Sequence, residues 1–335
     1  MASAHRPTLK TIAELSGFAV QTVSRALGDA PDISAKTKEK VRKIANEIGY
    51  VPNRAGVRLR TGKTNVISLV LSTDKNVLSL TARLIGSIAE GLRGTPYHLV
   101  VTPEFPDDDP MKAIRYIVQN STADAIILNR IQPEDPRVRF LMDEGFPFAT
   151  HGRTIWADQH PYFDYDNYEF GRLSVDALAD RGRKRLLLLA PPADQNYARE
   201  IVVGTSAQAK RRHVTLIPAA SLDSDSPGNL IRAYVADTLR NDGTIDGIIS
   251  PSPNAAMAAV AGCEDAGRHL GNDIDVFSKD TIPILDLFRT GIMTISEDIE
   301  KAGHFLAKAA VSAAKKGDSP PMQELDTPCH ETKGA

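Results

Sequence analysis

Short apolar runs alternate with longer amphipathic segments throughout the chain after residue 64. The runs predict strands at Val66–Leu71, His98–Thr102, Ala125–Asn129, Phe146–His151, Arg185–Ala190, Val214–Pro218, Gly247–Ser250 and Met293–Ser296. The amphipathic segments predict helices near 80–93, 110–120, 168–181, 199–212, 227–241, 254–267 and 298–316. Such alternation is typical of parallel sheets flanked by helices. Because the chain, with 335 residues, is too long for one core, we expect two α/β units. A ligand cleft is expected at the carboxyl ends of their strands.

The segment before residue 64 has a different pattern and predicts three short helices. Their expected ranges are Leu9–Leu15, Val20–Leu27 and Ala35–Ile48. Thr8 and Ser34 are suited to cap the first and third helices, and Gly17 breaks the chain after the first. Two helices joined by a short turn that contains glycine form a helix-turn-helix. Each helix has one apolar stripe, so the three can bury these stripes against one another.

Charge is distributed unevenly along the chain. Residues 1–63 contain 12 Lys and Arg against 5 Asp and Glu, although the whole chain has a formal net charge of −2. A basic head on an acidic body indicates a polyanionic partner for the head. A basic segment without a partner is the alternative, and the helical patterning of this segment counts against it.

The second predicted helix is the one that would enter the major groove of DNA. Its outward side chains are Val20, Gln21, Thr22 and Arg25. Gln pairs with adenine, Arg with guanine, and Val contacts a thymine methyl. Ser24 and Thr37 are candidates for phosphate contacts. The spacing by itself would equally suit a three-helix packing unit with no role in DNA binding.

The amino-acid sequences of three segments in the head identify a protein family more specifically than the spacing of the helices does. Residues 8–27, 33–42 and 48–54 closely resemble the head of the LacI/GalR family. The resemblance extends over nearly the whole chain and is sharpest in residues 6–62. It implies a helix-turn-helix domain at 6–52, a hinge helix and linker at 53–63, and an effector-binding and dimerisation core at 64–330.

The resemblance also assigns roles around the hinge, which in this family folds only on operator DNA. Leu59 matches the leucine that wedges into the central base step of the minor groove. Gly56 departs from the pattern, because glycine in a helix costs about 1 kcal/mol relative to alanine. We expect Leu59→Ala to lose most operator affinity and to leave dimerisation intact. The other DNA contacts implied in the head and hinge are Thr8, Tyr50, Asn53, Arg54 and Arg58.

In the body, the resemblance implies a core similar to periplasmic sugar-binding proteins, with two Rossmann-like parallel-sheet subdomains. The expected N-subdomain spans about 64–166 and 297–325, and the C-subdomain about 167–296. This resemblance rests on three sequence segments, residues 164–167, 271–281 and 293–298.

Polar side chains at or near the predicted strand ends are the candidates for effector binding, because carboxylates, amides and Arg hold sugar hydroxyls, often beside an aromatic face. They are Asp74, His151, Arg153, Asp166, Asn167, Tyr197, Arg199, Ser252, Asp280 and Glu297. For each one, a solvated loop end or a structural ion pair remains an alternative. Three family positions differ: Ile201 replaces an arginine, residues 250–254 lack the usual Asn-Asp pair, and Ser278-Lys279-Asp280 replaces Gly-Tyr-Asp. The sequence therefore leaves a glycoside, a sugar acid or phosphate, and a different metabolite open as the effector.

Together these features predict a sequence-specific transcriptional regulator, a repressor of carbohydrate uptake or catabolism genes that a sugar or sugar derivative releases from a near-palindromic operator. Residues 96–103 and 146–153 resemble repressors of α-glucoside operons. One alternative is a regulator whose ligand is a non-sugar metabolite or a co-repressor. A pure sugar-binding receptor and an enzyme are further alternatives. The sequence has no P-loop, G-x-S-x-G elbow or metal-ligand cluster, so we expect no enzymatic activity, metal or cofactor.

The chain also has features that bear on its location and assembly. No apolar run reaches the ~18 residues of a membrane span, and the N-terminus lacks the apolar stretch of a secretory signal. Cys263 and Cys329 have no metal-like spacing. We therefore expect a cytoplasmic protein without a membrane partner. No long leucine heptad follows residue 317, so a homodimer is expected rather than a tetramer.

Overall fold

The computed structural model describes residues 7–51, 56, 58, 61–73, 78–105, 107–280, 284–315 and 319–328. Contacts divide the chain into two units, residues 1–64 (the head) and residues 65–335 (the core). Among the described residues, no helix is both long and apolar enough to cross a membrane.

In the part of the head that the structure describes without gaps, residues 7–51, the helices are α1 (Leu9–Ser16), α2 (Val20–Leu27) and α3 (Ala35–Glu47), as the sequence predicts. The Thr8 side chain accepts a hydrogen bond from Thr11 N, and Ser34 caps α3 in the same way. Gly17 ends α1 with φ of +78°, a backbone conformation that glycine adopts without strain. The apolar stripes of the helices meet in a small core, whose fully buried members are Ile12, Val23, Ala26, Val41 and Ala45.

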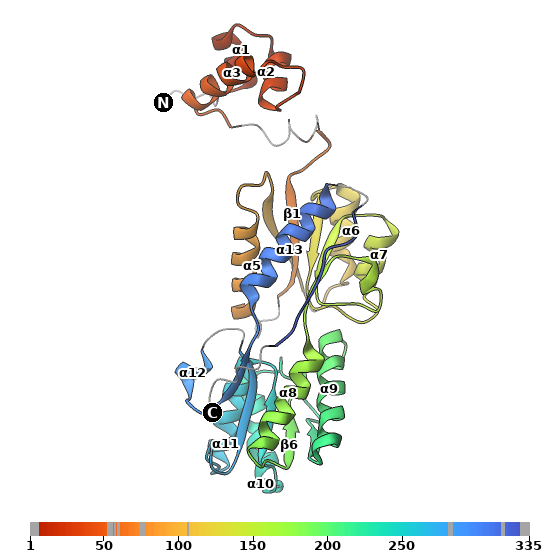
Figure 1. Ribbon diagram of the computed structural model, residues 1–335, viewed down its shortest axis with the longest axis vertical. Helices are drawn as coiled ribbons and strands as arrows, with labels where there is room; N and C mark the ends of the chain where they lie inside the picture. Colours follow the sequence, from red (N-terminus) through yellow and green to blue (C-terminus); the bar gives the residue numbers. More distant parts are fainter. Residues whose placement is uncertain are drawn as a thin grey trace. The chain divides into compact units, whose positions relative to one another are not determined.

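The core contains two parallel sheets (Figure 1). The first has the strand order β11-β5-β4-β3-β1-β2 and the second the order β10-β9-β8-β6-β7. The strands of the first sheet are β1 (Val66–Ser72), β2 (His98–Glu104), β3 (Ala125–Leu128), β4 (Phe148–His151), β5 (Tyr162–Tyr165) and β11 (Gln323–Asp326). Those of the second sheet are β6 (Arg185–Leu188), β7 (Thr215–Pro218), β8 (Gly247–Ser250), β9 (Asp275–Asp280) and β10 (Met293–Ser296).

Helices cover both faces of the first sheet. They are α5 (Leu78–Gly91), α6 (Met111–Asn120), α7 (Pro136–Asp143) and α13 (Ile299–Ala314). Alternate side chains of a strand point to opposite faces, so Ile127 of β3 packs in the cluster with α5 and α13. Its neighbours Ile126 and Leu128 pack in the cluster with α6 and α7.

The second sheet is covered in the same manner by helices of its own. They are α8 (Asn167–Asp180), α9 (Asn196–Arg212), α10 (Gly228–Asn241) and α11 (Pro253–Asp265), with the short α12 (Leu285–Phe288) beside α11. Leu187 of β6 faces α10 and α11, whereas Leu186 and Leu188 face α8 and α9. The predicted fold class, a helical head followed by an α/β core with two parallel sheets, is therefore confirmed.

Within the described residues, two segments carry the chain between the sheets. The first leads from β5 into α8 and the second from β10 into α13 (Figure 1). We call the six-stranded sheet with its helices the first subdomain, and the five-stranded sheet with its helices the second subdomain. Because every paired strand is parallel, the carboxyl ends of all strands in a sheet lie at one edge, where side chains from several strands can meet.

Candidate functional site

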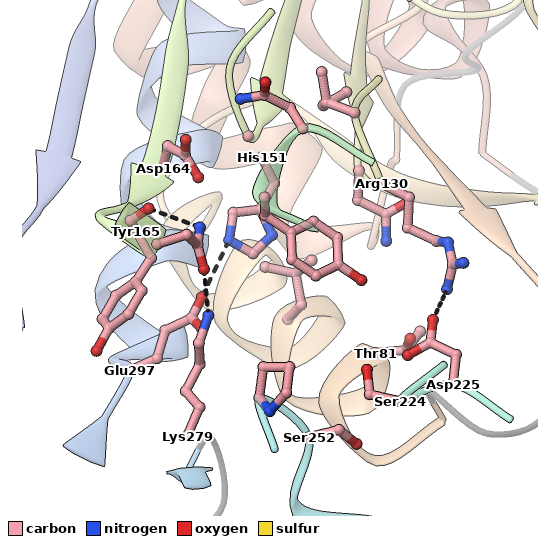
Figure 2. Close-up of a pocket in the computed structure, with 18 of the residues that line it drawn as sticks. Thr81, Arg130, His151, Asp164, Tyr165, Ser224, Asp225, Ser252, Lys279 and Glu297 are labelled. Carbon is pink, nitrogen blue, oxygen red and sulfur yellow. Dashed lines mark hydrogen bonds and ion pairs between the residues drawn. The ribbon is translucent and has the colours of Figure 1, made fainter. Parts of the chain in front are cut away.

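A cavity in the core is lined by residues of both subdomains (Figure 2). The first subdomain contributes the segments directly after β3 and β4 and the end of β5. The second contributes the start of α9, the loop before α10, the segment after β8, and the end of β9. Cavities at the carboxyl ends of parallel strands are the usual ligand sites of α/β proteins.

Lys279 in β9 is a buried cation at one end of this cavity, with a side chain 7% exposed. Its Nζ lies 3.0 Å from Glu297 Oε2, donates to Asn167 Oδ1 at 2.8 Å, and lies 4.4 Å from the centre of the Tyr165 ring (Figure 2). Asn167 in turn donates to the carbonyl of Tyr165 at 2.8 Å. Lys279 therefore joins β9 to both segments that pass between the subdomains.

His151 at the end of β4 faces the same carboxylate. Its Nε2 lies 3.8 Å from Glu297 Oε1. Burial lowers the pKa of His151, with a contribution from the Lys279 charge, although Glu297 opposes the shift. The imidazole is therefore neutral near pH 7, and it offers one donor and one acceptor nitrogen.

Arg153 lies between two carboxylates. Its guanidinium donates to Asp164 Oδ2 and to Glu200 Oε1, each at 2.8 Å. Burial and the charge of Glu200 raise the pKa of Asp164 to about 7, although Arg153 pulls in the opposite direction. Burial also raises the pKa of Glu200. Arg153 is therefore paired with two carboxyl groups whose ionisation burial opposes.

Arg130, directly after β3, reaches from one subdomain to the other. Its Nη1 donates to Asp225 Oδ2 at 2.8 Å, and Asp225 lies in the loop before α10 (Figure 2). Beside this pair, Asn196 N donates to the carbonyl of Ile131 at 2.8 Å. The cavity is therefore bordered by contacts that tie the two subdomains together.

A buried arginine on α7 fixes the backbone that carries Arg130. Arg137 Nη2 donates to the carbonyls of Asn129 at 3.1 Å and Arg130 at 3.0 Å. Arg137 also pairs with Asp135, whose side chain is fully buried, and with Glu104. Arg130 has φ of +53°, a strained conformation for a residue with a side chain, which persists where surrounding contacts enforce it.

The head presents exposed polar groups on α2. Val20 is 43% exposed, Gln21 and Arg25 are also exposed, and Thr22 and Ser24 are half-buried. Arg25 forms an ion pair with Asp32 in the loop before α3. The Thr37 hydroxyl lies 2.9 Å from that of Ser34, and Tyr50 packs against the core of the head.

Comparisons with known proteins match two parts of the chain. Residues 8–53 match the model of bacterial regulatory proteins of the lacI family. Residues 175–334 match the model of the periplasmic binding protein-like domain. The chain thus combines a DNA-binding domain of the LacI family with a periplasmic binding protein-like domain. It is therefore a DNA-binding transcriptional regulator and not an enzyme.

One curated relative and two solved structures match nearly the whole chain. The transcriptional regulator AglR of Rhizobium meliloti (strain 1021) is 27% identical over 331 residues, 95% of this chain and 90% of AglR. The CelR–cellobiose complex matches with a TM-score of 0.72 at 21% identity, covering 98% of this chain and 100% of CelR. The Lac repressor dimer bound to operator and the anti-inducer ONPF matches with a TM-score of 0.81 at 21% identity, covering 98% and 99%.

In this regulator, six of the ten predicted effector residues line the cavity. They are His151, Arg153, Asn167, Tyr197, Ser252 and Glu297. Asp74 lies outside the described residues. Asp280 ends β9 as predicted but is not among the residues that line the cavity.

Asp166 and Arg199 lie elsewhere than the sequence predicts. Both border a separate surface depression beside the start of α8 and α9. The Asp166 side chain caps α8 by accepting a hydrogen bond from Glu169 N at 2.9 Å. Arg199 lies two residues after Tyr197 on α9, and residues two apart on a helix point in different directions.

Several lining residues were not predicted from the sequence, above all Arg130, Asp225 and Lys279. Arg130 directly follows the predicted strand 125–129, so the strand-end rule would have found it. Lys279 lies within the segment Ser278–Asp280, which differs from the family's Gly-Tyr-Asp. No sequence pattern indicated Asp225, because it belongs to a loop that only the fold brings to the cavity.

The DNA-binding predictions at Asn53, Arg54 and Leu59 fall outside the described residues, whereas Gly56 and Arg58 have helical backbone. Among the described residues, one group could hold a metal ion: Glu90, Glu300 and His304 on α5 and α13. None of the three lines the cavity.

Proposed function

We propose that this regulator is a cytoplasmic repressor that binds a near-palindromic operator as a homodimer. A sugar or sugar derivative that occupies the cavity of the core releases the operator. The observation that carries the proposal is a cavity lined by charged and amide side chains of both subdomains, in a chain whose head has a helix-turn-helix.

The head supports recognition of a half-site. Val20, Gln21 and Arg25 are exposed on one short helix, and these types can contact thymine, adenine and guanine in the major groove. One such helix reads a half-site only, so a dimer on a symmetric site is expected. The hinge contacts, including the Leu59 wedge, remain predictions from the family resemblance.

The cavity supports a polyhydroxylated ligand. Carboxylates, amides and guanidinium groups lie beside apolar surfaces such as Tyr197 and Pro253, and hydroxyl groups of a sugar can pair with all of them. A relative of the same fold, CelR, has been solved with cellobiose. A ligand that contacts both subdomains favours one arrangement of them over others, which is the requirement for coupling to DNA binding.

The proposal is tested with a duplex that the full-length protein selects from a random pool. In gel-shift titrations, we expect Leu59→Ala to lose most affinity, and Gln21→Ala to lose about 1–3 kcal/mol with a relaxed preference at one base pair. Light scattering checks that both variants remain dimers.

A panel of mono- and disaccharides is then added to the complex. Release of the duplex at saturating ligand supports the proposal. Failure of the wild-type protein to select any duplex would overturn it, and a ligand that tightens the complex would replace the inducer by a co-repressor.

A further inference from the structure

The cavity contains three side chains that carry a positive charge, and among the described residues each is held by its own carboxylate. Arg130 lies 2.8 Å from Asp225. Arg153 lies 2.8 Å from Asp164 and from Glu200. Lys279 lies 3.0 Å from Glu297, as described above. No described lining cation is thus left for a ligand to neutralise.

The remaining ionisable side chains do not alter this balance. Burial lowers the pKa of His151, so the ring is neutral near pH 7. Burial raises the pKa of Tyr197, so the phenol keeps its proton. The walls of the cavity therefore offer many hydrogen-bonding groups and almost no net charge.

An anionic ligand would have to compete with one of these carboxylates. The Asp225 side chain is 15% exposed, so a displaced carboxylate would remain in a poorly solvated place. Leaving a buried charge without its partner is strongly unfavourable. An uncharged polyol avoids this cost, because its hydroxyls can donate to carboxylate oxygens and accept from guanidinium N–H groups while the ion pairs persist.

We propose that the Arg130–Asp225 pair is a charge filter: Asp225 neutralises Arg130, so that the cavity accepts an uncharged polyol and excludes sugar phosphates and sugar acids. This inference rests on the proposed function, since it assumes that the cavity is the effector site. It decides between ligand classes that the sequence leaves open.

Arg130 is the cation at which the filter can be tested most cleanly. Arg153 has two carboxylates that would both have to be replaced, and Lys279 also donates to Asn167, which lies between the subdomains. The backbone of Arg130 is held by Arg137, which belongs to the same subdomain and does not touch Asp225. Replacing Asp225 therefore leaves the Arg130 backbone supported.

The experiment compares matched ligand pairs by titration calorimetry on the full-length protein: maltose with maltobionate, cellobiose with cellobionate, and glucose with glucose 6-phosphate. For wild type, we expect the uncharged member of a pair to bind at least about tenfold more tightly. In Asp225→Asn, the anionic member should gain about tenfold relative to the uncharged one, because the variant lacks the carboxylate that neutralises Arg130 in wild type.

Two further variants show that the gain comes from Arg130. In the double variant Arg130→Gln/Asp225→Asn, the gain should disappear. Asp265→Asn, at the opposite end of α11 from the cavity, removes the exposed partner of Arg232 and should keep the wild-type ratio. Because the predicted effect is a change in the ratio of two affinities measured on the same protein, loss of folding cannot imitate it.

Tighter binding of the anionic member by wild type would overturn the filter, as would an unchanged ratio in Asp225→Asn. These failures differ from failure of the proposed function. If a sugar acid or phosphate releases the operator from wild type, the regulator stands and the filter falls. If wild type binds no selected duplex at all, the proposed function falls whatever the ligand ratios are.

Discussion

Asp164 is a buried carboxyl group whose charge depends on pH within the neutral range. Burial and the neighbouring Glu200 raise its pKa to about 7 in the folded chain, from 3.8 in the absence of these influences. Between these two values the folded chain holds a proton that the unfolded chain releases. Raising the pH across this window therefore favours unfolding.

The first prediction follows from this loss of stability with rising pH. Asp164 should contribute a fall in the free energy of unfolding on the order of 1.4 kcal/mol per pH unit between about pH 4 and pH 7. Asp164→Asn keeps an acceptor for Arg153 and removes the titration, so its stability should fall less steeply over this range. Urea unfolding at several pH values measures both slopes, and equal slopes would contradict the assignment.

Asp242 provides a matched control, because its pKa is shifted in the opposite direction from that of Asp164. Hydrogen bonds from Thr244 and Arg185 lower the pKa of the half-buried Asp242. Its contribution to stability is therefore present above its usual pKa and is lost only as the pH falls through the lowered value. Asp242→Asn should leave the slope between pH 5 and pH 7 as it is in wild type.

The second prediction concerns the buried Arg137. Its loss leaves the fully buried Asp135 and the nearby Glu104 without their cation. We expect Arg137→Ala to lower the free energy of unfolding by about 3–5 kcal/mol. Arg139→Ala on the same helix breaks an exposed pair with Asp143 and should cost less than about 1 kcal/mol. Similar losses in the two variants, measured by urea unfolding, would show that the network contributes no more than a surface pair.

Among the elements, α8 and α9 cross at a distance that only glycine permits. A Cβ on Gly204 of α9 would lie 2.1 Å from the carbonyl oxygen of Tyr168, and one on Gly171 of α8 would lie 2.7 Å from that of Ile201. This close crossing sets the position of the first turn of α9, which carries Asn196 and Tyr197 to the cavity.

The third prediction is that Gly204→Ala moves this turn. Overpacking at the crossing should lower the free energy of unfolding by about 1–3 kcal/mol, and ligand affinity should fall with it. Gly86→Ala on α5 is the matched control, because its Cβ would meet no atom within 4 Å. That substitution should stabilise the helix by up to about 1 kcal/mol. Unfolding curves and ligand titrations of the two variants compare the effects directly, and unchanged ligand affinity in Gly204→Ala would separate the crossing from the cavity.

The elements that the sequence predicts are those with their own hydrophobic pattern. Most strands and long helices of both subdomains were predicted because apolar residues recur along them, whereas β5 and β9 were not among the predicted strands. By contrast, β11 has Leu325 as its single apolar residue and pairs only with β5 at the edge of the sheet. In α7, an arginine occupies a buried position, and Asp164 does so in β5. Their burial depends on ion pairs, of Arg137 with Asp135 and Glu104 and of Asp164 with Arg153, which a pattern of apolar residues does not predict.

The same limit applies to the cavity. Strand-end reasoning found His151, Arg153 and Ser252, because their positions follow from single strands. It could not separate side chains that enter the cavity from those used in capping, such as Asp166. It also could not find Asp225, whose role depends on the approach of the two subdomains at Arg130.

On the scale of the whole molecule, the proposed repressor combines two binding events that must influence each other equally. If ligand weakens operator affinity by some factor, operator must weaken ligand affinity by the same factor. The coupling is typically about 1–3 kcal/mol, or roughly 5–150-fold. The cavity is the natural origin of this coupling, since it is bordered by residues that tie the subdomains, including Arg130 and Asp225.

The fourth prediction is therefore that ligand changes operator affinity by the same factor by which operator changes ligand affinity. Operator affinity is measured by fluorescence anisotropy with and without saturating ligand, and ligand affinity by calorimetry with and without saturating operator, at one salt concentration because phosphate contacts make DNA affinity depend on salt. Both ratios should agree, with the protein a dimer by light scattering in each state. A large effect of ligand on operator with none in reverse would mean that the ligand acts outside a linked equilibrium, for example by promoting aggregation. A ratio near one in both directions would mean that the cavity, although it binds ligand, does not control the head.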